Sequence, residues 1–131
     1  MFLSIDPADP LPIYDQIVRQ VKFAVANGAV KPGKLLPSVR ELAKQLRLNH
    51  NTVARAYREL QAQNIVLPIR GTGLEVTPQA LRGCRDSRLK LIRQRLRSAL
   101  KEAQRSQLDL SELRELIEEE LNRTYPEKIP K

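Results

Sequence analysis

Two short amphipathic segments, separated by an interruption at residues 47–49, constrain the fold of this chain more than any other feature. In both segments the apolar residues recur at the spacing of one buried face of an α-helix. They are Val39, Leu42, Ala43 and Leu46 in the first segment, and Val53, Ala56, Tyr57 and Leu60 in the second. Two short helices joined by so brief a turn predict a helix-turn-helix.

Polar residues mark where these two helices begin. Ser38 is followed three positions later by Glu41, which is the capping-box pattern. Asn49 stands directly before the second helix, where its side chain suits an N-cap. Both helix starts are therefore predicted from local chemistry.

A β-branched stretch follows the helix-turn-helix. Residues 65–69 form a first strand, residues 70–73 contain two glycines, and residues 74–76 can return as a second strand. This order predicts a two-stranded hairpin, or wing. Pro68 has no backbone N–H, so its strand should lie at a sheet edge.

The residues before the helix-turn-helix divide into an irregular segment and a helix. Residues 2–12 contain three prolines, which predicts a non-helical segment that crosses the surface. Residues 11–27 carry apolar residues at helical spacing, and Gly28 follows at the position of a C-cap.

The remaining residues are predicted to form two amphipathic helices. Thr77 and Pro78 form a helix start, with a hydroxyl N-cap and proline at the first helical position, and this helix should reach about Arg105. Residues 109–112 read as a second capping box. The predicted fold class is mainly α with a small β-hairpin: a winged helix-turn-helix domain over residues 1–76 and a two-helix dimerisation region over residues 77–131.

One apolar stripe on each tail helix makes a marginal core for so short a region. The stripes contain Leu89, Ile92, Leu96 and Leu100 on the first helix, and Leu113, Ile117 and Leu121 on the second. We expect a homodimer in which the two helix pairs form a four-helix arrangement. The alternative is that both helices pack back on residues 1–76.

The charge of the chain indicates an anionic partner. Its 131 residues include 23 Lys+Arg and 15 Asp+Glu, a formal net charge of +8, which is typical of nucleic-acid-binding proteins. Positive charge is concentrated in residues 77–105, whereas residues 106–131 are acidic. Part of the basic helix is therefore expected to face the acidic one, within a chain or across a dimer.

Composition also excludes several classes of protein. Cys84 is the only cysteine and His50 the only histidine, which excludes a disulfide framework and a cysteine-rich zinc site. No set of nucleophile and base is apparent, so we expect no catalytic residues, no metal and no cofactor. Cys84 is predicted to be a buried structural thiol, with redox sensing as the alternative. The chain has neither a run of eighteen apolar residues nor a signal-peptide pattern, so a cytoplasmic protein without a membrane partner is expected.

Taken in order, the motifs of residues 11–76 resemble the GntR family of bacterial transcription regulators. The matching stretches are residues 36–43 (LPSVRELA), residues 49–53 (NHNTV), Ala56, Tyr57, Leu60, and the Gly71-x-Gly73 loop. The two-helix tail and residues 14–16 (YDQ) are similar to the YtrA-type branch. The resemblance implies a winged helix-turn-helix that binds operator DNA as a dimer, and a repressor. The chain departs from the family at His50, at Asn64 and at residues 73–76 (GLEV).

Base readers are expected on the first turn of the second helix of the motif, because that end of the helix enters the major groove. Asn51 is expected to pair with adenine, and Thr52 to touch a phosphate or a thymine methyl. His50 is either a base reader or a solvated turn residue.

Backbone and groove contacts are expected from the helix starts and the wing tip. The residues are Ser38, Arg40, Arg55, Arg70, Gly71, Thr72 and Gly73. The family resemblance assigns Arg40 to DNA, against the alternative of an Arg–Glu pair on the helix surface. Arg55 is expected to reach a phosphate, and Arg70 a narrow minor groove.

The function predicted from these residues is that of a sequence-specific transcription regulator, acting as a homodimer on a pseudo-palindromic DNA operator. Two other functions fit the same sequence. A non-specific or architectural nucleic-acid binder would also explain the charge, and a comparison of cognate with random DNA at matched salt separates the two. A protein-interaction module, docking a basic partner on the acidic last helix, is the third. The residues identify no effector.

Overall fold

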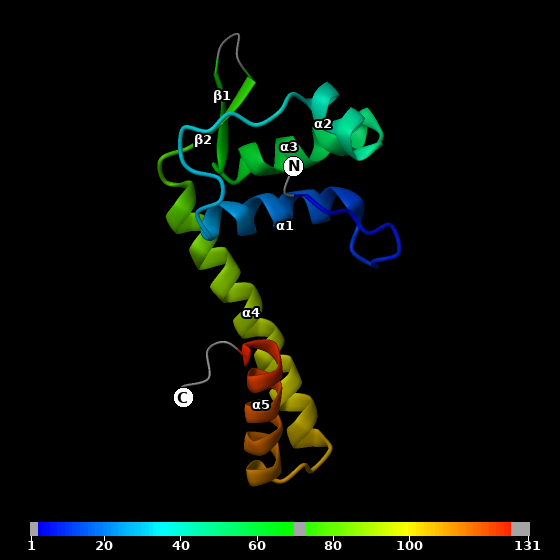
Figure 1. The fold of residues 1–131 in the computed structure, drawn as a ribbon, viewed down its shortest axis with the longest axis vertical. Helices are drawn as coiled ribbons and strands as arrows, with labels where there is room; N and C mark the ends of the chain where they lie inside the picture. The colour runs from blue at the N-terminus through cyan, green and yellow to red at the C-terminus, as the bar shows by residue number, and fades with distance from the viewer. Residues whose placement is uncertain (1–2, 70–72, 127–131) are drawn as a thin grey trace. The chain divides into compact units, whose positions relative to one another are not determined.

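The computed structural model describes residues 3–69 and 73–126 and divides into two compact units, Met1–Lys90 and Leu91–Lys131. Its elements, shown in Figure 1, are α1 (Ile13–Ala26), α2 (Val39–Leu46), α3 (His50–Ala62), β1 (Val66–Ile69), β2 (Gly73–Val76), α4 (Ala80–Arg105) and α5 (Leu110–Thr124). The predicted class, mainly α with a small hairpin, is confirmed. Among the described residues, no helix combines the length and the apolar character needed to span a membrane.

Helix α1 lies against α3 and supplies much of the first unit's core. Ile17, Val21 and Val25 are almost completely buried, as their helical spacing predicts. Gly28, with φ +84°, provides the left-handed residue that follows the helix end. Arg85 Nε donates a hydrogen bond to the Ala26 carbonyl (3.2 Å), which places a cation at the negative end of the α1 dipole.

Two glutamines of α1 tie down the segment that precedes it. The Gln16 carboxamide is buried, donates to the carbonyls of Asp6 and Leu11, and accepts from the Asp6 N–H, each at 2.9 Å. Gln20 accepts from the Ser4 N–H (2.7 Å) and donates to the Ser4 carbonyl (2.6 Å). The proline-containing segment is therefore non-helical, as predicted, but it is held by side chains rather than merely crossing the surface.

The helix-turn-helix forms as its capping residues predict. Ser38 Oγ accepts from the Glu41 N–H (3.0 Å), and Glu41 Oε1 accepts from the Ser38 N–H (3.2 Å), which completes the capping box. Arg47 adopts the left-handed conformation, with φ 55°, and ends α2. Asn49 Oδ1 accepts from the Asn51 N–H (2.7 Å) and begins α3. Local polar chemistry thus sets both ends of the turn.

The hairpin is antiparallel, and a further extended segment lies on its other side. Pro68 pairs with Leu74, and Leu35 forms an isolated bridge with Glu75. The Leu36 N–H donates to the Leu74 carbonyl (2.9 Å), so β2 has neighbours on both sides. Among the described residues β1 pairs with β2 alone, which confirms that Pro68 lies on an edge strand. The pairing of Leu35 was not predicted, because it joins residues distant in sequence.

The start of α4 differs from its prediction. Regular helix begins at Ala80, and Thr77 is buried instead of capping. Thr77 Oγ1 donates to the Asn64 carbonyl (2.8 Å), and the Thr77 N–H donates to the Ile65 carbonyl (2.9 Å). Thr77 therefore binds the residues that follow α3, because the polar groups of a buried residue need hydrogen-bond partners.

The division between the two compact units falls within α4, whereas the sequence pattern placed the domain boundary before this helix. Ala80 and Cys84 are buried in the core of the first unit. The second unit contains the rest of α4 together with α5, and α5 has no buried residue. At the start of α5, Asp109 accepts from the Ser111 N–H (3.2 Å) and is the N-cap, but among the described residues the Asp109 N–H does not donate to the Glu112 side chain, so the predicted capping box is not complete.

Candidate nucleic-acid interface

Helix α3 has one face in the core and another on the surface. Val53, Ala56 and Leu60 have no exposed surface, whereas His50 and Asn51 are exposed. Hydrophobic packing of one face against α1 and α2 therefore fixes which side chains the other face presents. The first turn of α3, where base readers were predicted, is accessible.

Asn51 keeps its side chain available. The cap of α3 is supplied by Asn49, which takes the Asn51 backbone N–H. The Asn51 carboxamide has no hydrogen-bond partner in the part of the chain that the structure describes. It can therefore offer one donor and one acceptor to the edge of a base. Thr52 is half-buried next to it.

Tyr57 anchors α3 against the segment that leads into α2. Its ring is buried, and its hydroxyl donates to the Pro37 carbonyl (2.7 Å). Burial, helped by the negative charge of Glu41, raises the pKa of Tyr57 above its ordinary value. The hydroxyl therefore stays protonated and keeps donating at neutral pH, which makes Tyr57 a structural residue.

Ser38 and Arg40 lie at the exposed start of α2. Ser38 uses its hydroxyl oxygen as an acceptor in the capping box, and its hydroxyl proton remains available to a phosphate. The single ion pair among residues 3–69 and 73–126 joins Arg123 to Glu120 (4.0 Å), so Arg40 is not engaged by a glutamate. The surface Arg–Glu pair considered as the alternative does not form.

Arg55 has a partner that the sequence did not predict. Its guanidinium carbon lies 3.8 Å from the centre of the Tyr14 ring of α1. The two residues are far apart in sequence, so only the packing of α1 against α3 brings them together.

The predicted wing contacts fall largely outside the described residues. Arg70, Gly71 and Thr72 lie in the undescribed stretch between the two strands. Gly73 is the exposed first residue of β2, pairs with Ile69 and has φ +108°, a conformation that side chains disfavour.

Among the described residues we find neither a metal-binding cluster nor a reactive cysteine. Residues 3–69 and 73–126 contain no group of three or more metal-binding side chains. Cys84 is a free, fully buried thiol, and burial raises its pKa, with the nearby charge of Lys22 opposing that effect. A buried thiol that resists ionisation is a poor nucleophile, which fits the predicted structural role.

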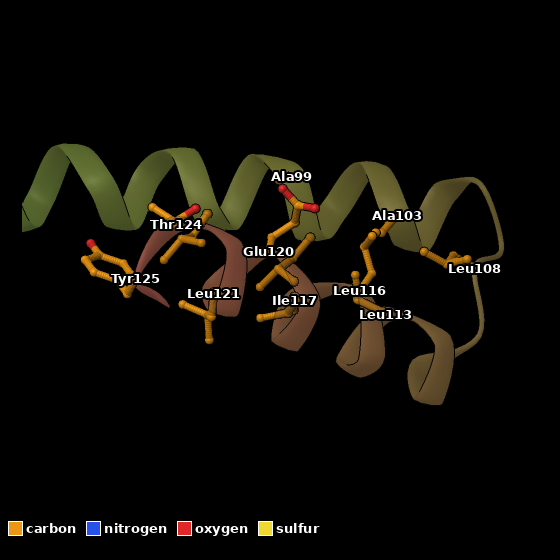
Figure 2. Close-up of a pocket in the computed structure, with 12 residues that line it drawn as sticks. Ala99, Ala103, Leu108, Leu113, Leu116, Ile117, Glu120, Leu121, Thr124 and Tyr125 are labelled. Carbon is orange, nitrogen blue, oxygen red and sulfur yellow. The ribbon is translucent and has the colours of Figure 1, made fainter. Parts of the chain in front are cut away.

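In the second unit, the apolar faces of α4 and α5 border an open groove of about 380 Å³. Figure 2 shows residues that line this groove, among them Ala99 and Ala103 of α4 and Ile117 and Leu121 of α5. Five of the predicted dimerisation residues line it: Leu96, Leu100, Leu113, Ile117 and Leu121. Leu89 and Ile92, predicted to belong to the same stripe, are exposed but lie outside the groove.

The sequence analysis missed part of this groove. Leu108 lies in the connection between the helices, and Tyr125 follows the end of α5. Neither falls within the helical repeat, although an aromatic residue directly after an amphipathic helix was an available signal. Within residues 91–126, no ion pair joins the basic α4 to the acidic α5.

Comparisons with known proteins place the chain in a family of DNA-binding regulators. The family model described as bacterial regulatory proteins, gntR family, matches residues 13–76. The HTH-type transcriptional repressor YtrA of Bacillus subtilis is 37% identical over 117 residues, which cover 89% of this chain and 90% of that protein.

Two solved structures share the fold over most of the chain. A transcriptional regulator from Oenococcus oeni has a TM-score of 0.75 and 30% identity, covering 92% of this chain and 99% of its own. YtrA from Sulfolobus acidocaldarius, a GntR-family transcription factor, has a TM-score of 0.59 and 33% identity, covering 75% of this chain and 99% of its own. The chain belongs to the GntR family of DNA-binding transcription regulators, and within that family to the YtrA-type branch.

Proposed function

We propose that this protein is a sequence-specific repressor that binds a pseudo-palindromic operator as a homodimer in the cytoplasm. The observation that carries the proposal is the division of α3 into a buried face and an exposed first turn with a free Asn51 carboxamide. A helix held in this way can enter a major groove without losing contacts with its own core.

Base reading is assigned to the first turn of α3. Asn51 pairs with adenine, Thr52 contacts a neighbouring base or phosphate, and His50 lies beside them. Because the net charge of the chain is concentrated outside α3, placed polar groups rather than bulk charge provide the sequence preference.

Backbone contacts are assigned to the elements that flank α3. Ser38 and Arg40 at the start of α2 and Arg55 on α3 bind phosphates. The wing tip, residues 70–73, contacts the minor groove. These contacts set affinity and orientation, and the loss of any one should weaken binding to all sequences alike.

Dimerisation is assigned to the second unit. Ile117 and Leu121 are exposed by 39% and 47% in the single chain and line the apolar groove. Covering this surface with the same surface of a second chain removes apolar area from water, and a two-fold dimer places two recognition helices on two half-sites. The name of the Bacillus subtilis relative, a repressor, supports the sign of the regulation.

The proposal is tested by selecting duplexes from a random pool with the full-length protein. We expect enrichment of two inverted half-sites, spaced by about one helical turn or a multiple of it. Sedimentation at micromolar concentration should give a dimer. Transcription in vitro from a promoter that overlaps the selected site should fall when the protein is added.

A non-specific nucleic-acid binder is the competing function, and its test is the same selection. Equal affinity for selected and shuffled duplexes at matched salt would support it and refute the proposal. A monomer in sedimentation would refute the dimer alone. Increased transcription would show an activator in place of a repressor.

A further inference from the structure

The contacts between α1 and α3 indicate that the two helices run in the same direction. Lys22 Nζ donates to Gln63 Oε1 (2.7 Å), and these residues are separated by 41 positions in sequence, as Tyr14 and Arg55 are. Figure 1 shows the two helices side by side in the first unit. Tyr14, at the start of α1, is therefore brought to the first turns of α3, where DNA is proposed to bind.

Arg55 lies on the same side of α3 as the proposed base readers. It follows Asn51 by four residues and Thr52 by three, and residues at these spacings are neighbours on a helix surface. Its side chain is exposed. A guanidinium held beside Tyr14 is thus next to the reading surface, on the side of α3 that is close to α1.

The contact with Tyr14 leaves the hydrogen-bonding groups of Arg55 without an acceptor among the described residues. The guanidinium carbon lies over the Tyr14 ring, 3.8 Å from its centre, and this contact is not a conventional hydrogen bond, so it occupies none of the five N–H donors with an acceptor atom. Residues 3–69 and 73–126 provide no acceptor for these donors. The planar group is therefore oriented while its edge remains able to bind a phosphate with two parallel hydrogen bonds.

We propose that Tyr14 is a positioning residue for DNA binding: its ring holds the Arg55 guanidinium in place for a backbone phosphate. A free arginine loses side-chain freedom when it binds, whereas the stacked one has lost part of it beforehand. Helix α1, which lies outside the helix-turn-helix, then contributes to DNA affinity through Arg55. This inference rests on the proposed binding surface of α3.

The test compares ring-bearing and ring-less variants in the full-length protein. Tyr14→Phe keeps the aromatic face, and Tyr14→Leu removes it while remaining apolar. Both are made in the wild-type and in the Arg55→Ala background. Affinities are measured on a duplex selected by the wild-type protein and on a shuffled duplex, over a range of salt concentrations.

Arg55→Ala should weaken binding to both duplexes by the same factor and reduce the slope of log affinity against log salt by about one. Tyr14→Leu should weaken both by about two- to fivefold, and Tyr14→Phe should bind like the wild type. In the Arg55→Ala background, Tyr14→Leu should cause no further loss, because the ring acts only through Arg55.

Lys22→Ala provides the matched control. Like Arg55→Ala, it removes a positive charge and a contact between α1 and α3. The contact that it removes lies at the other end of the helix pair. Lys22→Ala should change affinity by less than about twofold, since a charge distant from the proposed DNA surface is screened. Thermal unfolding checks each variant, and Tyr14→Met serves as a second ring-less variant if Tyr14→Leu does not fold.

Three results would overturn the inference. A loss from Tyr14→Leu that persists in the Arg55→Ala background would show that the ring acts without Arg55. A loss from Tyr14→Phe as large as that from Tyr14→Leu would assign the effect to the tyrosine hydroxyl. An Arg55→Ala variant with unchanged affinity and salt slope would remove the phosphate contact, while leaving the proposed regulator intact. Failure of the wild type to prefer the selected duplex would instead refute the proposed function.

Discussion

The two units of this protein treat their apolar side chains in opposite ways. Every residue of the buried core lies at or before Cys84, and α5 has none. In the first unit, helices α1 to α3 cover one another. In the second unit, Leu96 and Leu121 stay 57% and 47% exposed. The first unit therefore buries its core within a single chain, whereas the second exposes apolar side chains of the kind that a proposed subunit interface would cover.

The comparison predicts that truncating a leucine strongly destabilises the chain in the core of the first unit and has little effect at an exposed position of the second. Leu60→Ala should lower the free energy of unfolding by about 2–5 kcal/mol, because Leu60 is fully buried and leaves a cavity. Leu110→Ala, at a position 62% exposed, should cost less than about 0.5 kcal/mol. Urea denaturation measures both, and similar losses at the two positions would remove the contrast.

The reverse holds for self-association. Replacing Ile117 and Leu121 together by aspartate should weaken dimerisation by at least about 100-fold, or roughly 3 kcal/mol, because two charges would enter an apolar interface. Asn122→Asp adds a negative charge to the same helix outside the groove and should leave the dimer intact. Sedimentation reports the association state, and a dimer that survives the double substitution would disprove the interface.

Within the first unit, the proposed base readers and the proposed phosphate binders should respond differently to substitution. Asn51→Ala should lower the preference for the selected operator by about 1–3 kcal/mol at one base pair. Arg40→Ala should weaken all duplexes alike and reduce the salt slope by about one. Titrations of selected and shuffled duplexes separate the two effects, and equal losses on both duplexes for Asn51→Ala would exclude a reading role.

Ser38 combines the cap of α2 with a proposed phosphate contact. Ser38→Ala should cost about 1 kcal/mol of stability through the lost cap, and should also weaken DNA binding. Ser38→Asp should restore stability, since aspartate caps well, but not affinity, since it repels phosphate. Recovery of full affinity by Ser38→Asp would show that Ser38 acts through the cap alone.

The smallest expected effect concerns Asp109, the N-cap of α5. Its contribution to the stability of the fold should be lost only at acidic pH. Hydrogen bonds from Ser111 lower the pKa of Asp109 below its ordinary value. A carboxyl with a lower pKa in the folded chain stabilises it above the unfolded-state pKa, and this contribution is lost as pH falls through the lowered pKa. A carboxyl titration followed by NMR should show the lowered value, and an ordinary or raised value would contradict the cap.

The caps and apolar spacings of α2 and α3 were predictable because they depend on residues a few positions apart. Ser38 and Glu41 form hydrogen bonds with each other within one helical turn, and the Asn49 side chain accepts from the backbone N–H of Asn51. The candidate base readers were predictable for the same reason, since a helix whose apolar face is known has a known exposed face. The stripe of the second unit was likewise apparent, although the structure leaves Leu89 and Ile92 outside the groove.

Other features depended on contacts between distant parts of the chain. Thr77 looked like a cap, yet its hydroxyl bonds to Asn64, because burial there required a partner for it. Leu35 pairs with Glu75 because the packing of the helices brings its segment beside β2.

The sequence by itself determined the helices, the N-caps of α2, α3 and α5, the hairpin and the exposed face of α3, since each follows from local spacing and chemistry. Only the tertiary structure decided that Tyr14 lies on Arg55 and that the compact units divide inside α4. The physical reason is that such contacts join residues far apart along the chain, and their pairing is settled by how the buried faces pack together.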